Sequence, residues 1–475
     1  MEKKLLYFVG AGGIGMANLV RYWLGRGARV GGYDRTATQL TDALTAEGAE
    51  LVFEDDPELI PAEFLDPEKT LVVYTPAVSE DNRILSTFRR LGHEVIKRAA
   101  LLGKITDHTE AVCVAGSHGK TTTSSMIAWI LNGTEKGCNA FLGGILRNTG
   151  SNLMLSDRSR VAVIEADEYD RSFHHLKPQL AVVTSVDPDH LDIYGDEAGY
   201  LEGFAHFTSL IRPGGTLVVH KGLKLVPRTG EDVRTVTYTG RVVDGKAETD
   251  ADWHAENVRI VPGALYCDII GPDGFELRDV RPGVPVEINV DNAVAAAAAA
   301  HYCGATPEEI RRGIETFAGP ERRFQIWMGG TAADGGRVLI DDYAHSPNEV
   351  KASIESVRRL FPDHHLSVIF QPHLYTRTRD FAPEFSDALS AADRVIMTEI
   401  YPAREEPIEG VDSQMVLNKV EGAEKIYCER KDLLKLIENT NFEVLMTLGA
   451  ADLNVLLPAI EETLRAKEPL GKAVD

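Results

Sequence analysis

The chain has 475 residues, of which 26% are charged and 44% hydrophobic, and its formal net charge is −22 at pH 7. This length exceeds what one hydrophobic core holds, because domains usually contain about 100–200 residues, and the composition is that of a folded protein rather than a disordered one. The acidic balance repels phosphate backbones and anionic membranes, so neither nucleic acid nor a membrane is an expected partner.

Cysteine usage indicates a reducing compartment. The five cysteines include no Cys-x-x-Cys pair, and their spacing fits neither a zinc site nor a disulfide framework. A basic start followed by an uncharged run resembles a secretion signal, but the glycines at positions 10, 12, 13 and 15 would break the helix of such a signal. The sequence therefore predicts a cytoplasmic protein.

The first unit of the chain alternates strand and helix patterns. The runs LLYFVG and ARVGGYD are typical of strands, and a helix is predicted from Ile14 to Leu24 between them. The turn GAGGIG at residues 10–15 matches G-x-G-x-x-G, and Asp34 ends the second strand. Such a turn either serves tight packing alone or brings the backbone close to a diphosphate or nucleotide. The candidate ligand-binding residues are Gly12, Gly13, Ile14, Gly15 and Asp34.

A second glycine turn follows a polar stretch, GKITDHTEA at 103–111, which we interpret as a linker. The strand VCVAG leads into Gly-Ser-His-Gly at 116–119, and Lys120 and Thr121 then open a helix. The turn is shorter than the usual P-loop. Even so, its N–H groups can bind phosphate oxygens, Lys120 can reach the outer phosphates and Thr121 can offer its hydroxyl to Mg²⁺. A capped helix with an ordinary surface lysine is the alternative.

Acidic residues follow the next two apolar strands. Glu165 ends the run VAVIE, and Asp187, Asp189 and His190 follow LAVVTSV. The tips of parallel strands meet at one edge of a sheet, so these groups are expected beside the lysine turn. Carboxylates next to phosphates repel each other unless cations lie between them, and Mg²⁺ is the predicted cation because it prefers oxygen ligands.

The rest of the chain predicts two further features. Between about Asp250 and Pro285, Pro-Gly and Asp-Gly turns separate β-rich runs, which indicates hairpins added to the central sheet. Beyond FAGPERRF at 317–324, strand patterns separated by helical lengths form another α/β unit. The expected fold is α/β in three domains: a Rossmann-like domain at 1–104, a P-loop ATPase-type parallel sheet with hairpins at 105–319, and a second Rossmann-like domain at 320–475.

Eight motifs together resemble the Mur ligases, the ATP-dependent amino-acid ligases of bacterial cell-wall synthesis. In chain order they are GAGGIGM, GSHGKTTT, IEADEYD, DPDHLD, NVDN, GPERRF, DDYAH and PHLYTRT. Their order and spacing match the family over nearly the whole chain. The resemblance implies an N-terminal domain for a UDP-sugar, a central ATPase domain and a mobile C-terminal domain on the amino-acid side.

The resemblance also implies roles for particular residues. The implied ATP site consists of Gly116, Ser117, His118, Gly119, Lys120, Thr121, Thr122, Asn289, Asn292, Arg323, Asp342 and His345. The implied Mg²⁺ ligands are Thr121, Glu165 and His190, and the implied catalytic residues are Lys120, Glu165, His190 and Arg377. The first glycine turn, with Gly12, Gly13, Ile14, Gly15 and Asp34, would then bind the UDP-sugar rather than a dinucleotide.

The resemblance implies a reaction as well. ATP would convert the lactyl carboxylate of UDP-N-acetylmuramate into an acyl phosphate, which the amine of L-alanine then attacks, in peptidoglycan precursor synthesis. The family member that rejoins a recycled murein peptide to UDP-N-acetylmuramate is the alternative. The chain is expected to act as a monomer or a weak dimer, without nucleic acid or membrane.

Two interpretations outside the family explain less. A nicotinamide-dependent dehydrogenase would use the first glycine turn but leaves Lys120 and Glu165 without a role, and a nucleotide-binding regulator would require a lost lysine or metal ligand. The chain departs from the family pattern at Leu374, where PHRYTRT has arginine. The next lysine after His190 is Lys221, beyond the place where several Mur ligases carry a carbamylated lysine. No carbamate is therefore predicted.

Overall fold

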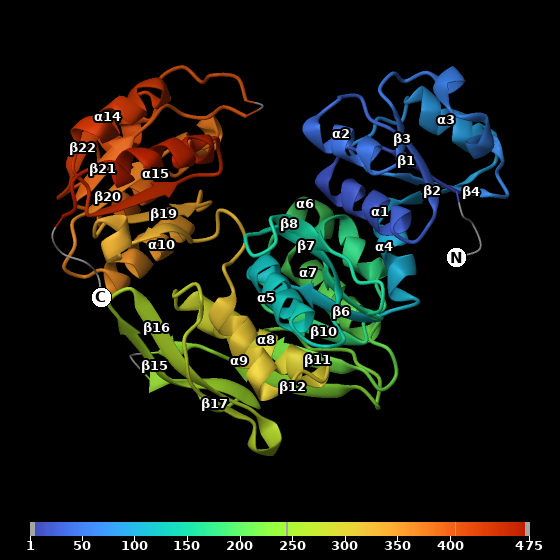
Figure 1. Cartoon of the computed structure of the whole chain (residues 1–475), viewed down its shortest axis with the longest axis horizontal. Helices are drawn as coiled ribbons and strands as arrows, with labels where there is room; N and C mark the ends of the chain where they lie inside the picture. The colour runs from blue at the N-terminus through green and yellow to red at the C-terminus, as the bar shows by residue number, and fades with distance from the viewer. Residues whose placement is uncertain (1–4, 244–245, 404, 471–475) are drawn as a thin grey trace.

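The computed structural model describes residues 5–243, 246–403 and 405–470, and within them the strands form three large sheets and a short ribbon, β13–β14 (Val242–Val243 and Lys246–Ala247). Each large sheet with its helices forms a separate lobe (Figure 1). The blue N-terminal lobe and the orange-red C-terminal lobe lie at the two ends of an arc, and the central lobe lies between them. This arrangement confirms the predicted three-domain α/β fold, while the bounds at 104 and 319 stay predictions.

The N-terminal sheet is parallel and has the strand order β3-β2-β1-β4-β5. Alternate residues of its first strand are buried in two different apolar clusters, Leu6 and Phe8 in one and Tyr7 and Val9 in the other, because helices cover both faces. Its elements, with η for 3-10 helices, are β1 (Leu5–Val9), α1 (Ile14–Leu24), β2 (Arg29–Tyr33), α2 (Gln39–Ala46), β3 (Glu50–Val52), η1 (Pro57–Leu59), η2 (Ala62–Leu65), β4 (Thr70–Tyr74), α3 (Arg83–Arg90), β5 (Glu94–Lys97) and α4 (Arg98–Thr106).

The expected linker at 103–111 is wrong, because helix α4 continues to Thr106 and the next strand begins at Glu110. Leu101 and Ile105 of α4 are buried. Gly103 lies so close to the backbone of the next domain that a Cβ would overlap the His175 carbonyl group. The polar composition of this stretch indicates a linker, but its few apolar residues lie on a helix and pack between two domains.

The central sheet has the order β17-β16-β15-β12-β11-β10-β6-β9-β7-β8. The strands from β15 to β7 in that order pair in parallel. The antiparallel pairs β15–β16 and β16–β17 are the predicted hairpins, and the antiparallel pair β7–β8 was not predicted. Its elements are β6 (Glu110–Ala115), α5 (Lys120–Asn132), β7 (Asn139–Leu146), β8 (Ser151–Met154), β9 (Val161–Glu165), η3 (Tyr169–His175), β10 (Leu180–Val183), α6 (Leu191–Tyr194), α7 (Glu197–Ser209), β11 (Thr216–His220), β12 (Arg234–Thr239), β15 (Trp253–Val261), β16 (Ala264–Ile270), η4 (Pro272–Gly274), β17 (Glu276–Val280), α8 (Ile288–Tyr302) and α9 (Pro307–Thr316).

The C-terminal sheet has the order β18-β19-β23-β20-β21-β22, in which β18 is antiparallel to its neighbour and the other pairs are parallel. Its elements are β18 (Gln325–Gly329), η5 (Ala332–Asp334), β19 (Val338–Asp342), α10 (Pro347–Leu360), β20 (Leu366–Phe370), α11 (Tyr375–Asp380), α12 (Ala382–Leu389), β21 (Arg394–Met397), α13 (Gln414–Leu417), β22 (Glu424–Tyr427), η6 (Arg430–Asp432), α14 (Leu433–Asn439), β23 (Val444–Leu448), η7 (Leu453–Leu456) and α15 (Leu457–Arg465).

The order of the central strands places the site. Strand β6 lies in the middle of its sheet, with β9 on one side and β10 on the other, and all three run in the same direction. Their carboxyl ends therefore meet at one edge, which is where ligands bind in open parallel sheets. No helix in the described part of the chain is long and apolar enough to cross a membrane.

Candidate active site

The loop at 116–119 joins β6 to α5 and is held from the end of β10. Gly116 and Gly119 have φ angles of +147° and +79°, which favour glycine, and a Cβ at Gly116 would overlap the Thr184 hydroxyl. The Thr184 hydroxyl donates to the His118 carbonyl at 2.5 Å, and the His118 N–H donates to the Ser185 hydroxyl at 2.7 Å. The loop is thus braced in a shape that presents the start of α5, where N–H groups favour an anion.

Ser117 connects this loop to a buried tyrosine. The Ser117 hydroxyl donates to the Asp187 carbonyl at 2.6 Å and lies 2.9 Å from the hydroxyl of Tyr200, which is fully buried on α7. Because the serine proton is used toward Asp187, the tyrosine hydroxyl donates to Ser117. The His118 ring lies mostly exposed on the outer side of the loop, with Nε2 3.6 Å from an oxygen of Asp187.

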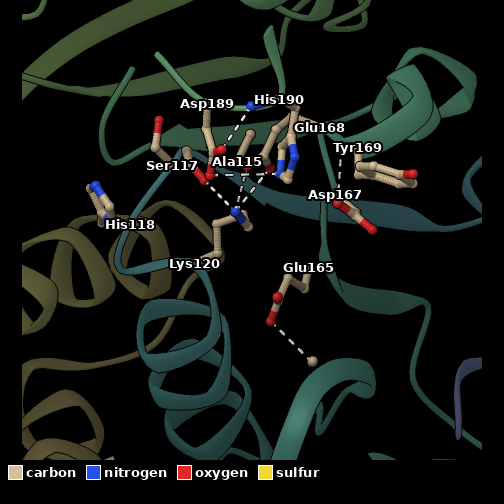
Figure 2. Close-up of polar contacts among 12 residues, drawn as sticks. Ala115, Ser117, His118, Lys120, Glu165, Asp167, Glu168, Tyr169, Asp189 and His190 are labelled. Carbon is tan, nitrogen blue, oxygen red and sulfur yellow. Dashed lines mark hydrogen bonds and ion pairs between the residues drawn. The ribbon is translucent and has the colours of Figure 1, made fainter. Parts of the chain in front are cut away.

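Lys120 forms a buried ion pair with Glu168. The lysine Nζ donates to the Gly116 carbonyl at 2.5 Å and lies 2.9 and 2.8 Å from the two carboxylate oxygens of Glu168 (Figure 2). The Glu168 side chain is 2% exposed and the Lys120 side chain 15%. The Tyr194 hydroxyl in turn donates to the Glu168 carbonyl at 2.6 Å. A carboxylate this buried requires a cation, so Glu168 holds the ammonium beside the loop.

Glu165 lies on the other side of Lys120, at the tip of β9 (Figure 2). It accepts hydrogen bonds from the Thr121 hydroxyl at 3.1 Å and from the Gly143 N–H at 3.0 Å. A side chain at position 143 would overlap the carboxylate. Burial raises the pKa of Glu165, and the Thr121 hydrogen bond and the charge of Lys120 oppose that shift. Thr121 and Glu165 thus present oxygen atoms close together.

His190 precedes α6 and has a φ of +51°. Its Nε2 atom lies 3.7 Å from an Asp189 oxygen, and its ring meets the ring of Tyr169 edge-on with centroids 5.1 Å apart. It lies on the same side of Lys120 as Glu168, opposite Glu165 (Figure 2). Over the described stretches of the chain, no three side chains of His, Cys, Asp or Glu are grouped to hold a metal.

A cavity of about 620 Å³ adjoins the loop and lies between the central and C-terminal domains. This volume is in the range of small-molecule sites. The central domain contributes apolar groups to its wall, including Val284, Val286 and Ile288, and the last of these is 65% exposed. Its lining includes most of the predicted ATP residues, namely His118, Gly119, Thr122, Asn289, Asn292, Arg323 and Asp342.

The two asparagines of α8 belong to a chain of buried hydrogen bonds. The Thr123 hydroxyl donates to Asn292 at 3.0 Å, and Asn292 donates to Asn289 at 3.0 Å. On the same turn of α8, Asp291 accepts from the Gly240 N–H at 2.6 Å and lies 3.1 Å from Nε2 of the buried His220. The first turn of α8 is therefore fixed to α5 and to the ends of β11 and β12.

The C-terminal domain contributes a half-buried carboxylate and several cations. Asp342 accepts hydrogen bonds from the Ser353 hydroxyl and from the Phe324 N–H, and burial raises its pKa. The Arg323 guanidinium lies 5.7 Å from the ring centre of Tyr343. The backbone N–H of His345 donates to the Glu349 carboxylate at 3.0 Å, and burial lowers the pKa of the His345 imidazole.

Arg377 lies on α11, away from the contacts that hold Asp342. Its Nη1 atom is buried and has no hydrogen-bond partner within the described ranges. The charge of Arg377 contributes to lowering the pKa of both His345 and His373. Leu374, which precedes α11, has a φ of +72°, an unusual value for a residue with a side chain.

The N-terminal glycine turn is closed by Asp34. The Gly12 N–H donates to one carboxylate oxygen of Asp34 at 2.8 Å, and the Thr36 N–H donates to the other at 3.2 Å. Ile14 stands 61% exposed at the start of α1. A second cavity, of about 120 Å³, lies between this domain and the central one, and its lining includes Gly15, Arg98, Glu165 and Asp167.

Comparison with known proteins identifies the family. Family models match three successive stretches: "Mur ligase family, catalytic domain" at 5–110, "Mur ligase middle domain" at 114–300, and "Mur ligase, glutamate ligase domain" at 322–450. The UDP-N-acetylmuramate–L-alanine ligase of Parabacteroides distasonis is 50% identical over 459 residues, which cover 97% of each chain. The chain belongs to the Mur ligase family.

Solved structures of Mur ligases share the fold. The UDP-N-acetylmuramate–alanine ligase of Thermotoga maritima is 25% identical, with a TM-score of 0.74 over 96% of this chain and 98% of the other. The murein peptide ligase of Psychrobacter arcticus is 19% identical, with a TM-score of 0.60 over 98% and 99% of the two chains. At that identity, the second likeness concerns the fold alone.

This Mur ligase brings together most of the residues singled out in the sequence, but not all. The loop, Lys120, Thr121 and Glu165 form one connected group, whereas His190 contacts Asp189 and Tyr169 instead. Lys221 pairs with Asp250 and so takes no part in this group. Glu168 belongs to the acidic run after β9, but no role for it is predicted from the sequence.

The donor set of the Mur ligase suits ATP and Mg²⁺. The braced loop is a cradle that side chains at Gly116 or Gly119 would fill. The Thr121 hydroxyl and the Glu165 carboxylate lie together as hard oxygen donors, and Mg²⁺ usually takes one or two protein carboxylates and completes its shell with water and phosphate. A pair of protein donors rather than a full cage is therefore what such a site requires.

Proposed function

We propose that this Mur ligase joins L-alanine to the lactyl carboxylate of UDP-N-acetylmuramate at the expense of ATP, as a step of peptidoglycan precursor synthesis. The observation that carries the proposal is the 50% identity over 97% of both chains to a ligase named for that reaction. This proposal includes ATP and Mg²⁺ as ligands, the residue roles, and the domain bounds 1–104, 105–319 and 320–475. It also includes a cytoplasmic location and a monomer or weak dimer.

The reaction would proceed in two steps. A carboxylate oxygen of the sugar attacks the γ-phosphorus of ATP, and ADP leaves with the electron pair of the broken P–O bond. The amine nitrogen of alanine then attacks the acyl carbon and loses a proton, and inorganic phosphate leaves. Both steps join groups that are poorly reactive or like-charged, so positioning and charge stabilisation carry most of the catalysis.

The described residues supply that positioning. The loop N–H groups and Lys120 would bind the outer phosphates, while Glu168 keeps the ammonium in place from behind. Two unit charges about 4 Å apart at an effective dielectric constant near 20 repel by about 4 kcal/mol, so an uncompensated carboxylate and phosphate would react slowly. When bound at Thr121 and Glu165, Mg²⁺ would screen that repulsion. His190 lies at the same edge of the sheet and is a further proposed ligand of Mg²⁺.

The C-terminal domain would complete the site. Arg323 and Asp342 line the far wall of the large cavity, so a nucleotide held there touches both domains. His345 and Arg377 face the same side of this domain and would contact the amino-acid substrate or the transferring phosphate. Asn289 and Asn292, fixed by Thr123, would contact the base.

Phosphate release tests the proposal directly. The purified chain is mixed with ATP, Mg²⁺ and UDP-N-acetylmuramate, and L-alanine, glycine, L-serine or the murein tripeptide is added in turn. We expect the highest kcat/KM with L-alanine and ligated product of the corresponding mass. Phosphate release with the tripeptide and with no other acceptor would show that the chain is a peptide-recycling ligase instead. Absence of phosphate release with every acceptor would refute both the alanine-ligase and the recycling-ligase function.

A further inference from the structure

One stretch of chain, residues 317–324, connects helix α9 of the central domain to strand β18 of the C-terminal domain. Within this interdomain connection, Gly319, Arg322 and Phe324 have φ angles of +82°, +59° and +47°. Such values are uncommon for residues with a side chain, so neighbouring contacts must hold the connection in this shape. Because the C-terminal domain moves only when the connection bends, those contacts bear directly on that movement.

The end of strand β7 pairs with the interdomain connection. The Glu321 N–H donates to the Ile145 carbonyl at 2.8 Å, and the Arg147 N–H donates to the Gly319 carbonyl at 3.1 Å. These two hydrogen bonds flank an antiparallel bridge between the two segments. Backbone contacts thus fasten the first part of the connection to the central domain.

The side chain of Arg147 reaches further along the chain than its backbone does. Its Nη1 atom donates to the Ala318 carbonyl at 3.1 Å, and its Nη2 atom donates to the Ile326 carbonyl at 3.2 Å. Ala318 precedes the residues with positive φ, whereas Ile326 follows them in strand β18 of the C-terminal domain. One half-buried guanidinium, a rigid fork of charged donors, therefore links the two ends of the connection.

The same end of β7 also contacts the proposed metal site. The Gly143 N–H donates to the Glu165 carboxylate at 3.0 Å. A Cβ at Gly144 would lie 3.2 Å from the Cγ2 atom of Thr121 and 3.5 Å from the Cβ atom of Pro320. Gly144 thus lies between the side chain of Thr121 and the interdomain connection. A few residues of β7 and the turn after it contact both the proposed Mg²⁺ ligands and the chain that carries the C-terminal domain.

We propose that Arg147 is a positioning residue that fixes the pivot about which the C-terminal domain closes on the nucleotide. This inference rests on the proposed function and adds to it a residue outside the ligand sites. With the guanidinium in place, the connection turns between the two carbonyl groups that it holds, and closure brings Arg323 and Asp342 to the nucleotide in one arrangement. Without it, β18 approaches in many arrangements, and the closed state costs more conformational entropy.

Phosphate release and small-angle scattering on the full-length chain test this role. Arg147→Met keeps the apolar stem and removes both side-chain hydrogen bonds. We expect kcat to fall at least tenfold while the KM for UDP-N-acetylmuramate stays within twofold, because closure is lost and the proposed sugar site lies on another domain. The decrease in radius of gyration on adding a non-hydrolysable ATP analogue, Mg²⁺ and UDP-N-acetylmuramate should disappear. Arg147→Lys, which keeps the charge without the fork, should lie between.

Asn148→Ala is the matched control, because Asn148 holds only the central-domain side of the connection. Its side chain donates to the Thr316 carbonyl at 2.8 Å and accepts from the Ala318 N–H at 2.8 Å. This variant should be less stable in urea than the wild type, yet close and turn over like it. Wild-type kcat or wild-type compaction in Arg147→Met, or an equal loss in Asn148→Ala, would overturn the assignment. If Arg147→Met does not fold, wild-type kcat in Arg147→Lys overturns it.

The two measurements separate this inference from the proposed function. A wild-type chain that releases no phosphate with any acceptor would refute the proposed function, while scattering of the wild type and of Arg147→Met with the ATP analogue would still decide the role of Arg147. A wild-type chain that releases phosphate but does not become more compact with the ligands would overturn this inference alone.

Discussion

At the scale of single residues, the central feature is that Lys120 has two tasks. Its Nζ donates to the Gly116 carbonyl of the loop that we propose to bind phosphate, and it neutralises Glu168, whose side chain is almost completely buried. Removing one partner of a buried ion pair leaves an unpaired charge, which costs up to about 3–5 kcal/mol. A lysine variant therefore confounds loss of function with loss of stability, and the pair must be changed together.

We predict that Lys120→Ala abolishes ligation and also lowers the free energy of unfolding, because Glu168 loses its cation. The double variant Lys120→Met with Glu168→Gln should recover most of that stability and none of the activity. Urea unfolding and phosphate release measure the two effects. Lys177→Ala, at an exposed pair with Asp107, is the control for removal of a lysine. Ligation by the stable double variant would rule out Lys120 as the phosphate ligand.

Part of this site could be predicted from the sequence and part could not. The proximity of Lys120, Thr121 and Glu165 follows from strand tips that share one sheet edge. The pairing of Lys120 with Glu168 does not, because Asp167, Glu168 and Asp170 follow β9 in one acidic run, and the course of η3 decides which of them turns inward.

At the scale of elements, a residue with an unfavourable backbone conformation precedes α11. Leu374 has φ +72° and ψ 136°, a conformation close to a region that essentially only glycine adopts, and such residues cost of order 1–3 kcal/mol. The helix that follows carries Tyr375 and Arg377 toward the proposed amino-acid side. The conformation thus fixes where this helix starts.

We predict that Leu374→Gly raises the free energy of unfolding by about 1 kcal/mol, because glycine adopts this conformation without the steric cost. Urea unfolding measures the change. Asp387→Gly, at an exposed position inside α12, should instead lower stability by about 0.5–1 kcal/mol. If both glycine variants are destabilised alike, the backbone at Leu374 is not strained in solution.

The hairpin of β18 and β19 contains a carboxylate that couples stability to pH. Burial alone would raise the pKa of Asp334, but hydrogen bonds from Thr331, from the Gly329 N–H and from Arg465 outweigh it and lower the pKa below its ordinary value. A lowered carboxyl pKa stabilises the fold above the unfolded-state pKa of about 3.9, and this stabilisation is lost as pH falls through the folded-state value.

Asp334→Asn should therefore be less stable than the wild type at pH 7. The difference should begin to shrink below about pH 4, where Asp334 of the unfolded chain takes up a proton, and it should vanish as pH falls through the lowered folded-state pKa. Urea midpoints across this pH range measure it. Asp387→Asn on the exposed face of α12 serves as the control and should follow the wild type at every pH. A difference between Asp334→Asn and the wild type that does not change with pH would contradict the ionic role of Asp334.

The elements themselves were largely predictable, with one exception. The helix from Ile14 to Leu24, the strands that carry the motifs and the hairpins after Asp250 follow from periodicity and turn residues. The helix at 98–106 is not predicted by the sequence, which indicates a linker from 103, because its buried positions pack against another domain and local composition does not report such packing. Tertiary context overrides a weak local preference there.

At the scale of the whole molecule, the large cavity is lined by two domains. The central and C-terminal domains contact each other through the ion pair of Glu287 with Arg359 and through a hydrogen bond of 3.0 Å from the Gly263 N–H to the Leu360 carbonyl. A nucleotide that touches both walls favours arrangements in which they are close. Domain movement at this interface is the expected response to ligand.

We predict that the chain becomes more compact when a non-hydrolysable ATP analogue, Mg²⁺ and UDP-N-acetylmuramate are all bound. Small-angle scattering should show a smaller radius of gyration with the full set of ligands than with UDP alone, since the proposed UDP site lies on the N-terminal domain. Equal radii in the two conditions would mean that the C-terminal domain does not close over the nucleotide.

The most direct measurement is a crystal structure with a non-hydrolysable ATP analogue and Mg²⁺. We expect the outer phosphates at the loop of residues 116–119, within hydrogen-bond distance of Lys120, with the metal ion at Thr121 and Glu165. Phosphate density at another place, with Lys120 still bonded only to Gly116 and Glu168, would contradict the assignment of this loop as the ATP site.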